Sequence, residues 1–146
     1  MSKAFRDRIQ IMNEMYKLPV HDTPYLFKDT DARLQKFKKT LIDEVNEIDE
    51  ILNQIHSNES ETEVQVAIAD LLGDIIVYCR SEAMKYGIPL EEVIDIIMDS
   101  NESKLGADGK PIYDENGKFL KGPNYWKPEP RIRELLAGHT SEKNNI

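Results

Sequence analysis

The sequence contains few of the residues that cross-link small proteins. Its one cysteine, Cys79, stands inside an apolar run, and only three histidines are present. A lone cysteine excludes an intramolecular disulfide framework and a cysteine-rich zinc site. The N-terminus is charged from the start and has no signal-like apolar segment, so the sequence predicts a cytoplasmic protein.

Long hydrophobic runs and an excess of positive charge are also missing. The longest apolar stretch, Val64–Cys79, contains Asp70 and Asp74, which makes it too short and too charged to cross a bilayer. Lys and Arg number 19 against 27 Asp and Glu, for a formal net charge of −8. Nucleic-acid backbones are bound by clustered Lys and Arg, so an acidic chain predicts no nucleic acid as partner. Because no stretch of the sequence suits a bilayer, we also expect no membrane as partner. An anion complexed with a metal ion is still compatible with this charge.

What is present fits one folded domain. The 146 residues are 40% hydrophobic, with seven glycines and seven prolines, so a single core can form and neither a disordered nor a fibrous chain is indicated. We expect residues 1–146 to comprise an N-terminal helix and loop (1–30), a helical core (31–100), a Lys- and Gly-rich hairpin (101–130) and a flexible tail (138–146).

Periodic apolar residues predict mainly helices. Ser60 with Glu63 forms a capping-box pattern, Gly87 stands at a C-terminal capping position, and Asn116-Gly117 separates two short extended runs. We therefore expect an all-α protein, a four-to-five-helix bundle with a small C-terminal β-hairpin. The expected helices are Phe5–Tyr16, Asp31–Ile55, Ser60–Tyr86, Pro89–Ser100 and Arg131–Ala137.

The second helix carries the clearest apolar stripe and a row of acids beside it. At about 100° per residue, Glu44 lies roughly 60° and Glu47 about 120° from the stripe residue Leu41, on the same side. Asp43 and Glu50 fall nearly opposite the stripe. We therefore expect Glu44 and Glu47 to border the buried side, and Asp43 and Glu50 to face water. The stripe consists of Leu34, Phe37, Leu41, Val45, Ile48, Leu52 and Ile55.

The third helix is apolar around nearly its whole circumference, which predicts burial on most sides. It nevertheless carries Asp70 and Asp74 on one face, and burying either as a bare anion costs several kcal/mol without a partner. Carboxylates from two neighbouring helices can converge on a divalent ion, and oxygen donors without histidine favour Mg²⁺ or Mn²⁺. Gly73, beside Asp74, is expected either to admit a close neighbour or to serve simple helix packing.

A longer pattern links these acids to a known family. Glu44-x-x-Glu47 on one helix and Asp74 in DLLGD on the next are followed by SNESKLGADGKPIYDENGKFLKGPNYWKP. Over roughly Met12–Pro130 the chain resembles the all-α nucleoside triphosphate pyrophosphohydrolases. It looks most like the phosphoribosyl-ATP pyrophosphohydrolase-like branch, related to MazG proteins and dimeric dUTPases. The acidic pairs alone are a loose motif, whereas the downstream Asn, Lys, Gly and Tyr string is much more specific.

The resemblance implies a MazG-like fold and a Mg²⁺-dependent hydrolase. Such an enzyme uses metal-activated water to release pyrophosphate and a nucleoside monophosphate from its nucleotide substrate. The residues that carry these roles are Glu44, Glu47 and Asp74 for the metal and catalysis, with Asp70 as an added metal ligand, and Asn101, Lys104, Lys121 and Tyr125 for the substrate.

Two positions depart from the family pattern. The second motif is usually Glu-x-x-Asp, but Leu71 stands three residues before Asp74, and the acid is Asp70 instead. Asp70 lies only about 40° from Asp74 around the helix, so it can still face the same site. Asp43 takes the first place of a pair of glutamates that the family often has. The number of metal ions and the role of Asp70 are left open by these differences.

A non-catalytic helical module that dimerises, or binds a partner through its acids, is the alternative to an enzyme. In either case the apolar excess of the third helix predicts a homodimer or higher homo-oligomer, because a chain of this size has little of its own surface to cover it. The preferred base is not predicted. The aromatic residues of His21–Phe27 and Tyr125-Trp126 are open to two roles, stacking on a base or packing within the protein.

Overall fold

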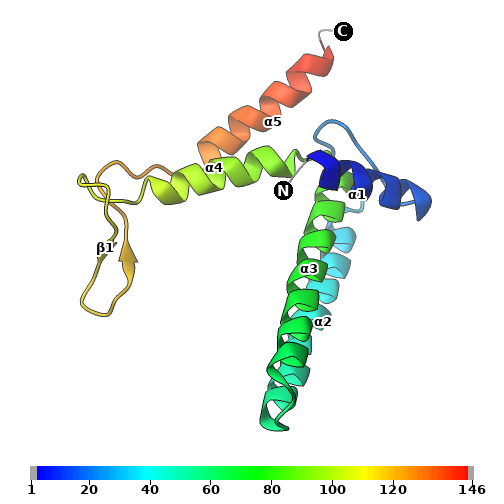
Figure 1. Cartoon of the computed structure of the whole chain (residues 1–146). Helices are drawn as coiled ribbons and strands as arrows, with labels where there is room; N and C mark the ends of the chain where they lie inside the picture. The colour runs from blue at the N-terminus through cyan, green and yellow to red at the C-terminus, as the bar shows by residue number, and fades with distance from the viewer. Residues whose placement is uncertain (1–2, 145–146) are drawn as a thin grey trace. The chain divides into compact units, whose positions relative to one another are not determined.

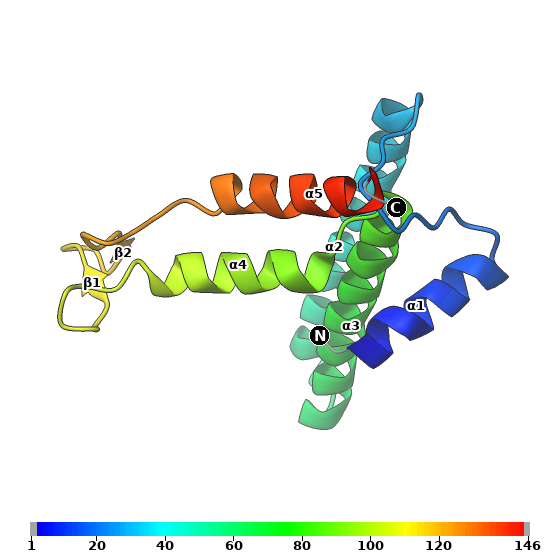
Figure 2. The same ribbon diagram turned by 90° about the horizontal axis from the view of Figure 1, so that it is seen from above.

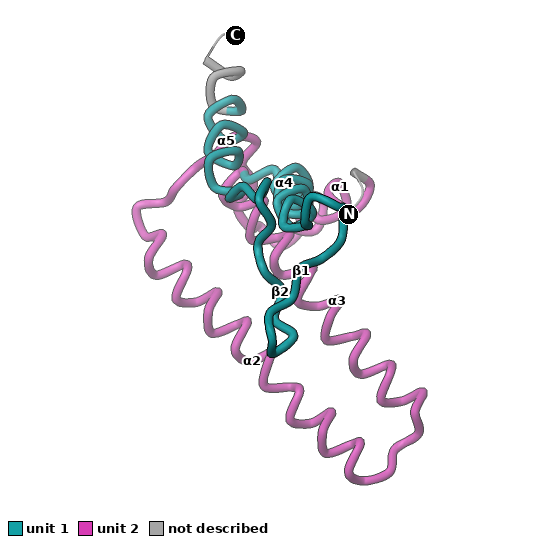
Figure 3. Tube along the Cα trace, turned by 90° about the vertical axis from the view of Figure 1, so that its left-hand side faces the viewer, with its two compact units in different colours: residues 1–2, 88–146 teal, residues 3–87 magenta. Residues whose placement is uncertain are grey.

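The computed structural model describes the backbone of residues 3–144 and the side chains of residues 4–139. Within these residues the chain forms five α-helices and one pair of short strands (Figure 1). The elements divide into two compact units, which we call the helical-hairpin unit (Lys3–Gly87) and the C-terminal unit (Ile88 onward) (Figure 3). The predicted all-α class with a small hairpin is confirmed, and the single-domain organisation stays a prediction.

The helical-hairpin unit is built on two long helices that run side by side, α2 (Thr30–His56) and α3 (Glu61–Lys85) (Figures 1 and 2). The hydroxyl of Ser60 accepts a hydrogen bond from the backbone N–H of Glu63 at 3.2 Å, as the capping-box pattern predicted. At the other end of α3, Gly87 has a φ of +63°, a conformation that favours glycine. The predicted start and stop signals of α3 are therefore confirmed.

Helix α1 (Lys3–Met15) packs on α3 through a buried polar pair. The Nδ2 of Asn13 donates to the backbone carbonyl of Ser81 at 3.2 Å, and the Ser81 hydroxyl donates to Asn13 Oδ1 at 2.7 Å. Asn13 has no exposed surface, so these bonds satisfy an amide that water cannot reach. The loop after α1 is joined to the same end of α3, since His21 Nδ1 lies 2.7 Å from the carbonyl oxygen of Lys85.

The two long helices cover each other along one face only. On α2, Ile51 is 8% exposed but the predicted stripe residue Val45 is 50% exposed; on α3, Leu71 is 6% exposed and Leu72 is 56% exposed. Two helices in contact share a single seam, so the prediction that α3 is buried on most sides is wrong for the described chain. The other apolar side chains left exposed on α2 and α3 include Ile42, Ile48, Leu52, Ile55, Val66, Ile68 and Ile76.

In the C-terminal unit, helices α4 (Leu90–Glu102) and α5 (Glu129–Asn144) pack on each other (Figure 2). Between them, β1 (Ile112–Tyr113) pairs antiparallel with β2 (Phe119–Leu120). Gly117 lies in the connecting turn with a φ of +79°, which the Asn-Gly pair predicted. The hairpin expected within residues 101–130 is therefore confirmed.

Two local predictions in this unit need correction. Helix α5 is longer than the expected Arg131–Ala137, because it tolerates Gly138 and continues to Asn144 through most of the segment expected as a tail. The spacing of Leu90, Val93, Ile94 and Ile97 predicts that these side chains point inward on α4. Ile97 is nevertheless 39% exposed, so the contacts within the unit do not cover all of the apolar surface of α4. None of the described helices combines the length and the apolar character needed to cross a membrane.

Candidate active site

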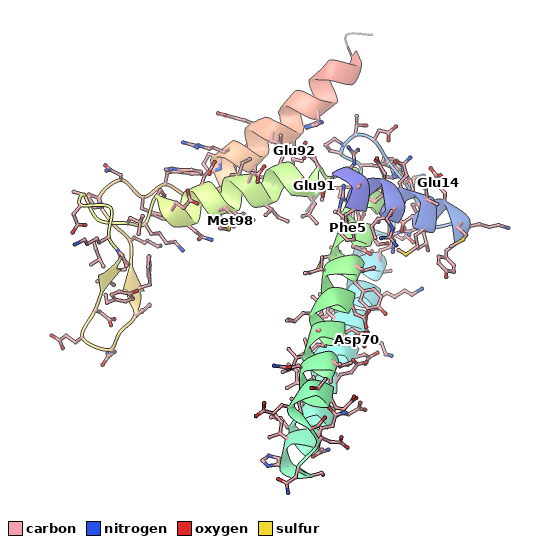
Figure 4. All side chains as sticks on the ribbon, viewed as in Figure 1. Phe5, Glu14, Asp70, Glu91, Glu92 and Met98 are labelled. Atoms are coloured by element: carbon pink, nitrogen blue, oxygen red, sulfur yellow. The ribbon has the colours of Figure 1, made fainter. Side chains whose placement is uncertain are left out.

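Glu44, Glu47, Asp70 and Asp74, which we call the carboxylate cluster, lie on the two long helices. Glu44 and Asp74 are half-buried, whereas Glu47 and Asp70 are exposed, and Figure 4 marks Asp70 part-way along α3. Spacings of three and four residues place each pair on one side of its helix. We expected both acids of α3 to be buried and to need a compensating partner. This argument applies to Asp74, which is half-buried, and not to Asp70, which is exposed.

The carboxylates of the cluster interact with one another. The charge of Glu44, followed by desolvation and the charges of Glu50, Asp74 and Asp70, raises the pKa of Glu47 above its ordinary value. Among the side chains of residues 4–139, none of the four acids forms an ion pair with Lys or Arg. The cluster therefore carries negative charge that the described part of the chain does not balance.

The cluster fits a hard cation in charge and donor type. Oε2 of Glu44 is buried and has no hydrogen-bond partner among the described residues, and a buried acceptor in this state needs a cation or water. However, no three His, Cys, Asp or Glu side chains within residues 4–139 come close enough to hold one metal ion between them. Mg²⁺ is usually bound by one or two carboxylates together with water and substrate phosphates, and the cluster suits that mode rather than an all-protein cage.

The departure from the family pattern at Leu71 has a structural explanation. Leu71 is buried in the core, so no carboxylate is available from this position of α3. Asp70, one residue earlier, is exposed, and its charge is the smallest of the causes that raise the pKa of Glu47. A Cβ on Gly73 would have nothing within 4 Å, so the expectation that Gly73 admits a close neighbour is wrong for the described chain.

Tyr78 is a member of this region that the sequence did not single out. Burial raises the pKa of the Tyr78 hydroxyl, as do, in decreasing order, the charge of Glu44, a side-chain hydrogen bond with Glu44, and the charges of Asp74 and Glu47. These interactions place Tyr78 beside the cluster. It stands four residues after Asp74, one helical turn away, and this spacing is the signal by which it could have been found. Asp74 and Tyr78 both line a cavity of about 390 Å³ within the helical-hairpin unit.

The aromatic residues before α2 pack on one another. His21 stacks on Tyr25 with ring centroids 4.0 Å apart, and Phe27 meets both rings edge to face. The guanidinium carbon of Arg33 lies 3.9 Å from the centroid of the Phe27 ring. Of the two roles that the sequence left open for this segment, the structure shows the packing role.

In the C-terminal unit, Lys104, Lys121 and Tyr125 form what we call the lysine corner. The Nζ of Lys104 lies 6.0 Å and that of Lys121 4.9 Å from the centroid of the Tyr125 ring. Cations at this range are attracted to the face of an aromatic ring. The fourth predicted substrate residue, Asn101, is exposed in the last turn of α4, and its carbonyl accepts the backbone N–H of Lys104 at 3.2 Å.

Hydrogen bonds of the backbone build the lysine corner. The N–H of Gly122 donates to the carbonyl of Lys104 at 2.7 Å, and the N–H of Trp126 donates to the Ser103 hydroxyl at 3.2 Å. A Cβ on Gly122 would collide with the carbonyl oxygen of Leu105, so the chain can approach this closely only at glycine. The predicted metal residues thus lie within one unit and all four predicted substrate residues lie within the other, where three of the four form the lysine corner.

The comparison with solved structures bears on the fold. The chain matches a crystal structure from Exiguobacterium sp. 255-15 described as a "putative NTP pyrophosphohydrolase", with a TM-score of 0.55 and 19% sequence identity, over 98% of this chain and 99% of that one. The two chains share one fold. The all-α fold with a small hairpin that the sequence predicted is therefore confirmed. No protein-family model matches the sequence, and no curated protein matches it.

Proposed function

We propose that the protein is a divalent-metal-dependent pyrophosphohydrolase. Its substrate is a nucleoside or deoxynucleoside triphosphate, or a related nucleotide such as phosphoribosyl-ATP, which it cleaves to the monophosphate and pyrophosphate. The observation that carries the proposal is the carboxylate cluster, whose acids repel one another and have no basic partner in the described side chains. A cation would balance these charges and would also let a protein of net charge −8 accept an anionic substrate. The name of the matched structure supports the same reaction.

The residues divide into two roles in this proposal. The acids would hold the ion, no more than two of them binding it directly, and would orient the attacking water. The oxygen of that water bonds to a phosphorus of the α–β anhydride, the bridging P–O bond breaks, and pyrophosphate, the monophosphate and a proton are released. When bound, Mg²⁺ or Mn²⁺ neutralises phosphate charge and lowers the pKa of water. The proposed metal and catalytic residues are Glu44, Glu47 and Asp74, with Asp70 as a further metal ligand; the proposed substrate residues are Asn101, Lys104, Lys121 and Tyr125.

Pyrophosphate release from a panel of nucleotides, measured with Mg²⁺ or Mn²⁺, tests the proposal. We expect Glu47→Gln and Asp74→Asn each to lower kcat/KM by at least about 100-fold, because loss of even an outer-sphere partner of a metal ligand costs about 10–100-fold. Asp43→Asn is the matched control, since Asp43 is exposed on the same helix and pairs with Lys39 at 3.5 Å. Metal-independent release, or no release from any nucleotide, would favour the non-catalytic module.

We also propose that the chain acts as a cytoplasmic homodimer. The apolar side chains exposed on α2 and α3, among them Val45 and Leu72, support this proposal, because large apolar surfaces of this kind are usually covered by a partner. Size-exclusion chromatography with light scattering is expected to give a mass of at least two chains. A monomer at micromolar concentration would contradict the proposal.

A further inference from the structure

Two serines at the end of α4 hold the chain where it returns from the hairpin. Ser100 lies in the last turn of α4, and Ser103 is the C-terminal cap of that helix. The Ser100 hydroxyl donates to the carbonyl oxygen of Trp126 at 2.9 Å, and the N–H of Trp126 donates to the Ser103 hydroxyl at 3.2 Å. Both polar groups of the Trp126 backbone are therefore bound by side chains, and we call Ser100 and Ser103 the serine clamp.

The two members of the serine clamp also hold each other. The Ser103 hydroxyl donates to the carbonyl oxygen of Ser100 at 2.6 Å, so it gives one hydrogen bond and accepts another. Ser100 is only 2% exposed, and its bond to Trp126 is therefore shielded from water. A shielded backbone group that loses its partner is costly, because water does not replace the lost bond.

The serine clamp acts on the residue next to Tyr125 of the lysine corner. Ser103 and Trp126 are 23 residues apart in the chain, and the hairpin lies between them. Closing a loop of this kind costs conformational entropy, so bonds between its two ends must hold it shut. The N–H of Gly122, which bonds the carbonyl of Lys104, joins the two ends before Tyr125, and the serine clamp joins them after it.

We propose that the serine clamp positions the lysine corner for the phosphate groups of the substrate; this inference rests on the proposed function. Lys104 directly follows Ser103, and Tyr125 directly precedes Trp126. The bond between Ser103 and Trp126 therefore fixes the place of Lys104 beside the Tyr125 ring, which Lys121 also faces. Cations that are already in place lose little freedom when an anion binds, which favours binding. Both serines act through the lysine corner and are positioning residues.

Calorimetric titration of the full-length protein with inorganic pyrophosphate, in the presence of Mg²⁺, tests the serine clamp. We expect Ser103→Ala to weaken pyrophosphate binding by about 3- to 10-fold, the range that corresponds to one lost hydrogen bond. Ser103→Thr keeps the hydroxyl and is expected to bind within about twofold of the wild type. Affinity for Mn²⁺ without pyrophosphate is expected to be the same in all three proteins, because the proposed metal ligands lie in the other unit.

A double-mutant cycle separates positioning from a merely structural role. In a Lys121→Ala background, Ser103→Ala is expected to change pyrophosphate affinity by less than about twofold, because the pair of cations that the clamp positions no longer exists. A merely structural role would weaken binding by the same factor in both backgrounds.

A matched control and a substitute variant complete the set. Ser57→Ala is the control, since exposed Ser57 is the C-terminal cap of α2 as Ser103 is that of α4, and it is expected to bind pyrophosphate as the wild type does. If Ser103→Ala lacks the helical circular dichroism of the wild type, Ser103→Cys replaces it, because a thiol has similar size and forms only weak hydrogen bonds.

The outcomes separate the serine clamp from the proposed reaction. The clamp proposal is overturned if the wild type binds no pyrophosphate, if Ser103→Ala binds it unchanged, if Ser103→Thr binds as weakly as Ser103→Ala, or if the effects of the Ser103 and Lys121 substitutions are additive. Weaker binding in Ser103→Ala that depends on Lys121, with no hydrolysis of any nucleotide by the wild type, leaves the clamp standing and removes the proposed reaction. Hydrolysis by the wild type, with pyrophosphate binding that is insensitive to Ser103, has the opposite meaning.

Discussion

The carboxylate cluster and the lysine corner hold charges of opposite sign in different ways. In the lysine corner, hydrogen bonds around Gly122 and Trp126 and the ring of Tyr125 position two cations without help from a ligand. In the carboxylate cluster, like charges raise the pKa of Glu47, and a buried oxygen of Glu44 has no partner among the described residues. The described chain therefore organises the lysine corner by itself, whereas the charges of the cluster would need the proposed cation to balance them.

The largest effect expected from the lysine corner is on activity, and it separates the roles of the two regions. Lys104→Ala and Lys121→Ala are each expected to lower kcat/KM for nucleotide hydrolysis by about 10–100-fold, the cost of losing a hydrogen bond to a charged group. Their affinity for Mn²⁺, measured by calorimetry without substrate, is expected to match the wild type. Lys118→Ala, in the exposed hairpin turn, is the control and is expected to change neither quantity. Loss of Mn²⁺ affinity in Lys104→Ala would contradict the separation.

The second prediction compares a glycine-to-alanine substitution in each region, which is expected to change the free energy of unfolding in opposite directions. Gly122→Ala is expected to destabilise the protein by about 1–3 kcal/mol, because its Cβ would meet the backbone of Leu105. Gly73→Ala is expected to stabilise it by about 1 kcal/mol, since alanine favours helices and nothing lies within 4 Å of the added Cβ.

Denaturant unfolding measures both changes, with the single tryptophan, Trp126, reporting on the lysine corner and circular dichroism reporting on the helices. If Gly73→Ala destabilised the protein, a neighbour from outside the described chain would have to lie against α3. Such a result would sharpen the comparison, because it would support the proposed second copy of the chain as that neighbour.

The smallest expected effect concerns the pH dependence of stability in the absence of metal. Because the pKa of Glu47 is raised in the folded state, the folded protein retains this proton to higher pH than the unfolded chain. Stability is therefore expected to fall as pH rises from the ordinary Glu value of 4.5 through the raised value, as ionised Glu47 meets Glu44. Thermal unfolding in EDTA measures this fall.

Glu47→Gln is expected to weaken that pH dependence and to raise the Tm at pH 7. Mg²⁺ should raise the Tm of the wild type more than that of the variant, because binding to the folded state stabilises it. Glu50→Gln is a matched control on the same helix, with a smaller influence on the same carboxylate. Equal pH profiles for wild type and Glu47→Gln would contradict the electrostatic account of the cluster.

Local features of the fold were predictable because their causes lie close together in the chain. The hydroxyl of Ser60 caps α3, the positive φ of Gly87 ends it, and Asn116-Gly117 turns the hairpin. The length of α5 was not predicted, because Gly138 is a weak helix breaker and neighbouring residues can carry the helix across it.

The burial of the long helices could not be predicted from periodicity. Val45 and Ile51 are both apolar residues of α2, yet one is 50% and the other 8% exposed. Val45 belongs to the predicted stripe and Ile51 does not, so the covered surface departs from that stripe. Periodicity identifies a broad apolar side of the helix, and only the approach of α3 selects the part of it that is covered. The same approach buries Leu71 and leaves Asp70 exposed, which the helical angles alone did not distinguish.

The sequence by itself determined the helices, their caps, the hairpin and the helices on which the acids stand, because hydrogen bonds and side-chain preferences within a few residues decide these features. Only the tertiary structure decided that Asp74 and Asp70 of α3 add to the charges that raise the pKa of Glu47 on α2, that Tyr78 of α3 lies near Glu44, and that Phe37 and Asp74 line one cavity. These properties depend on distances between residues far apart in the chain, and such distances exist only once the helices have packed.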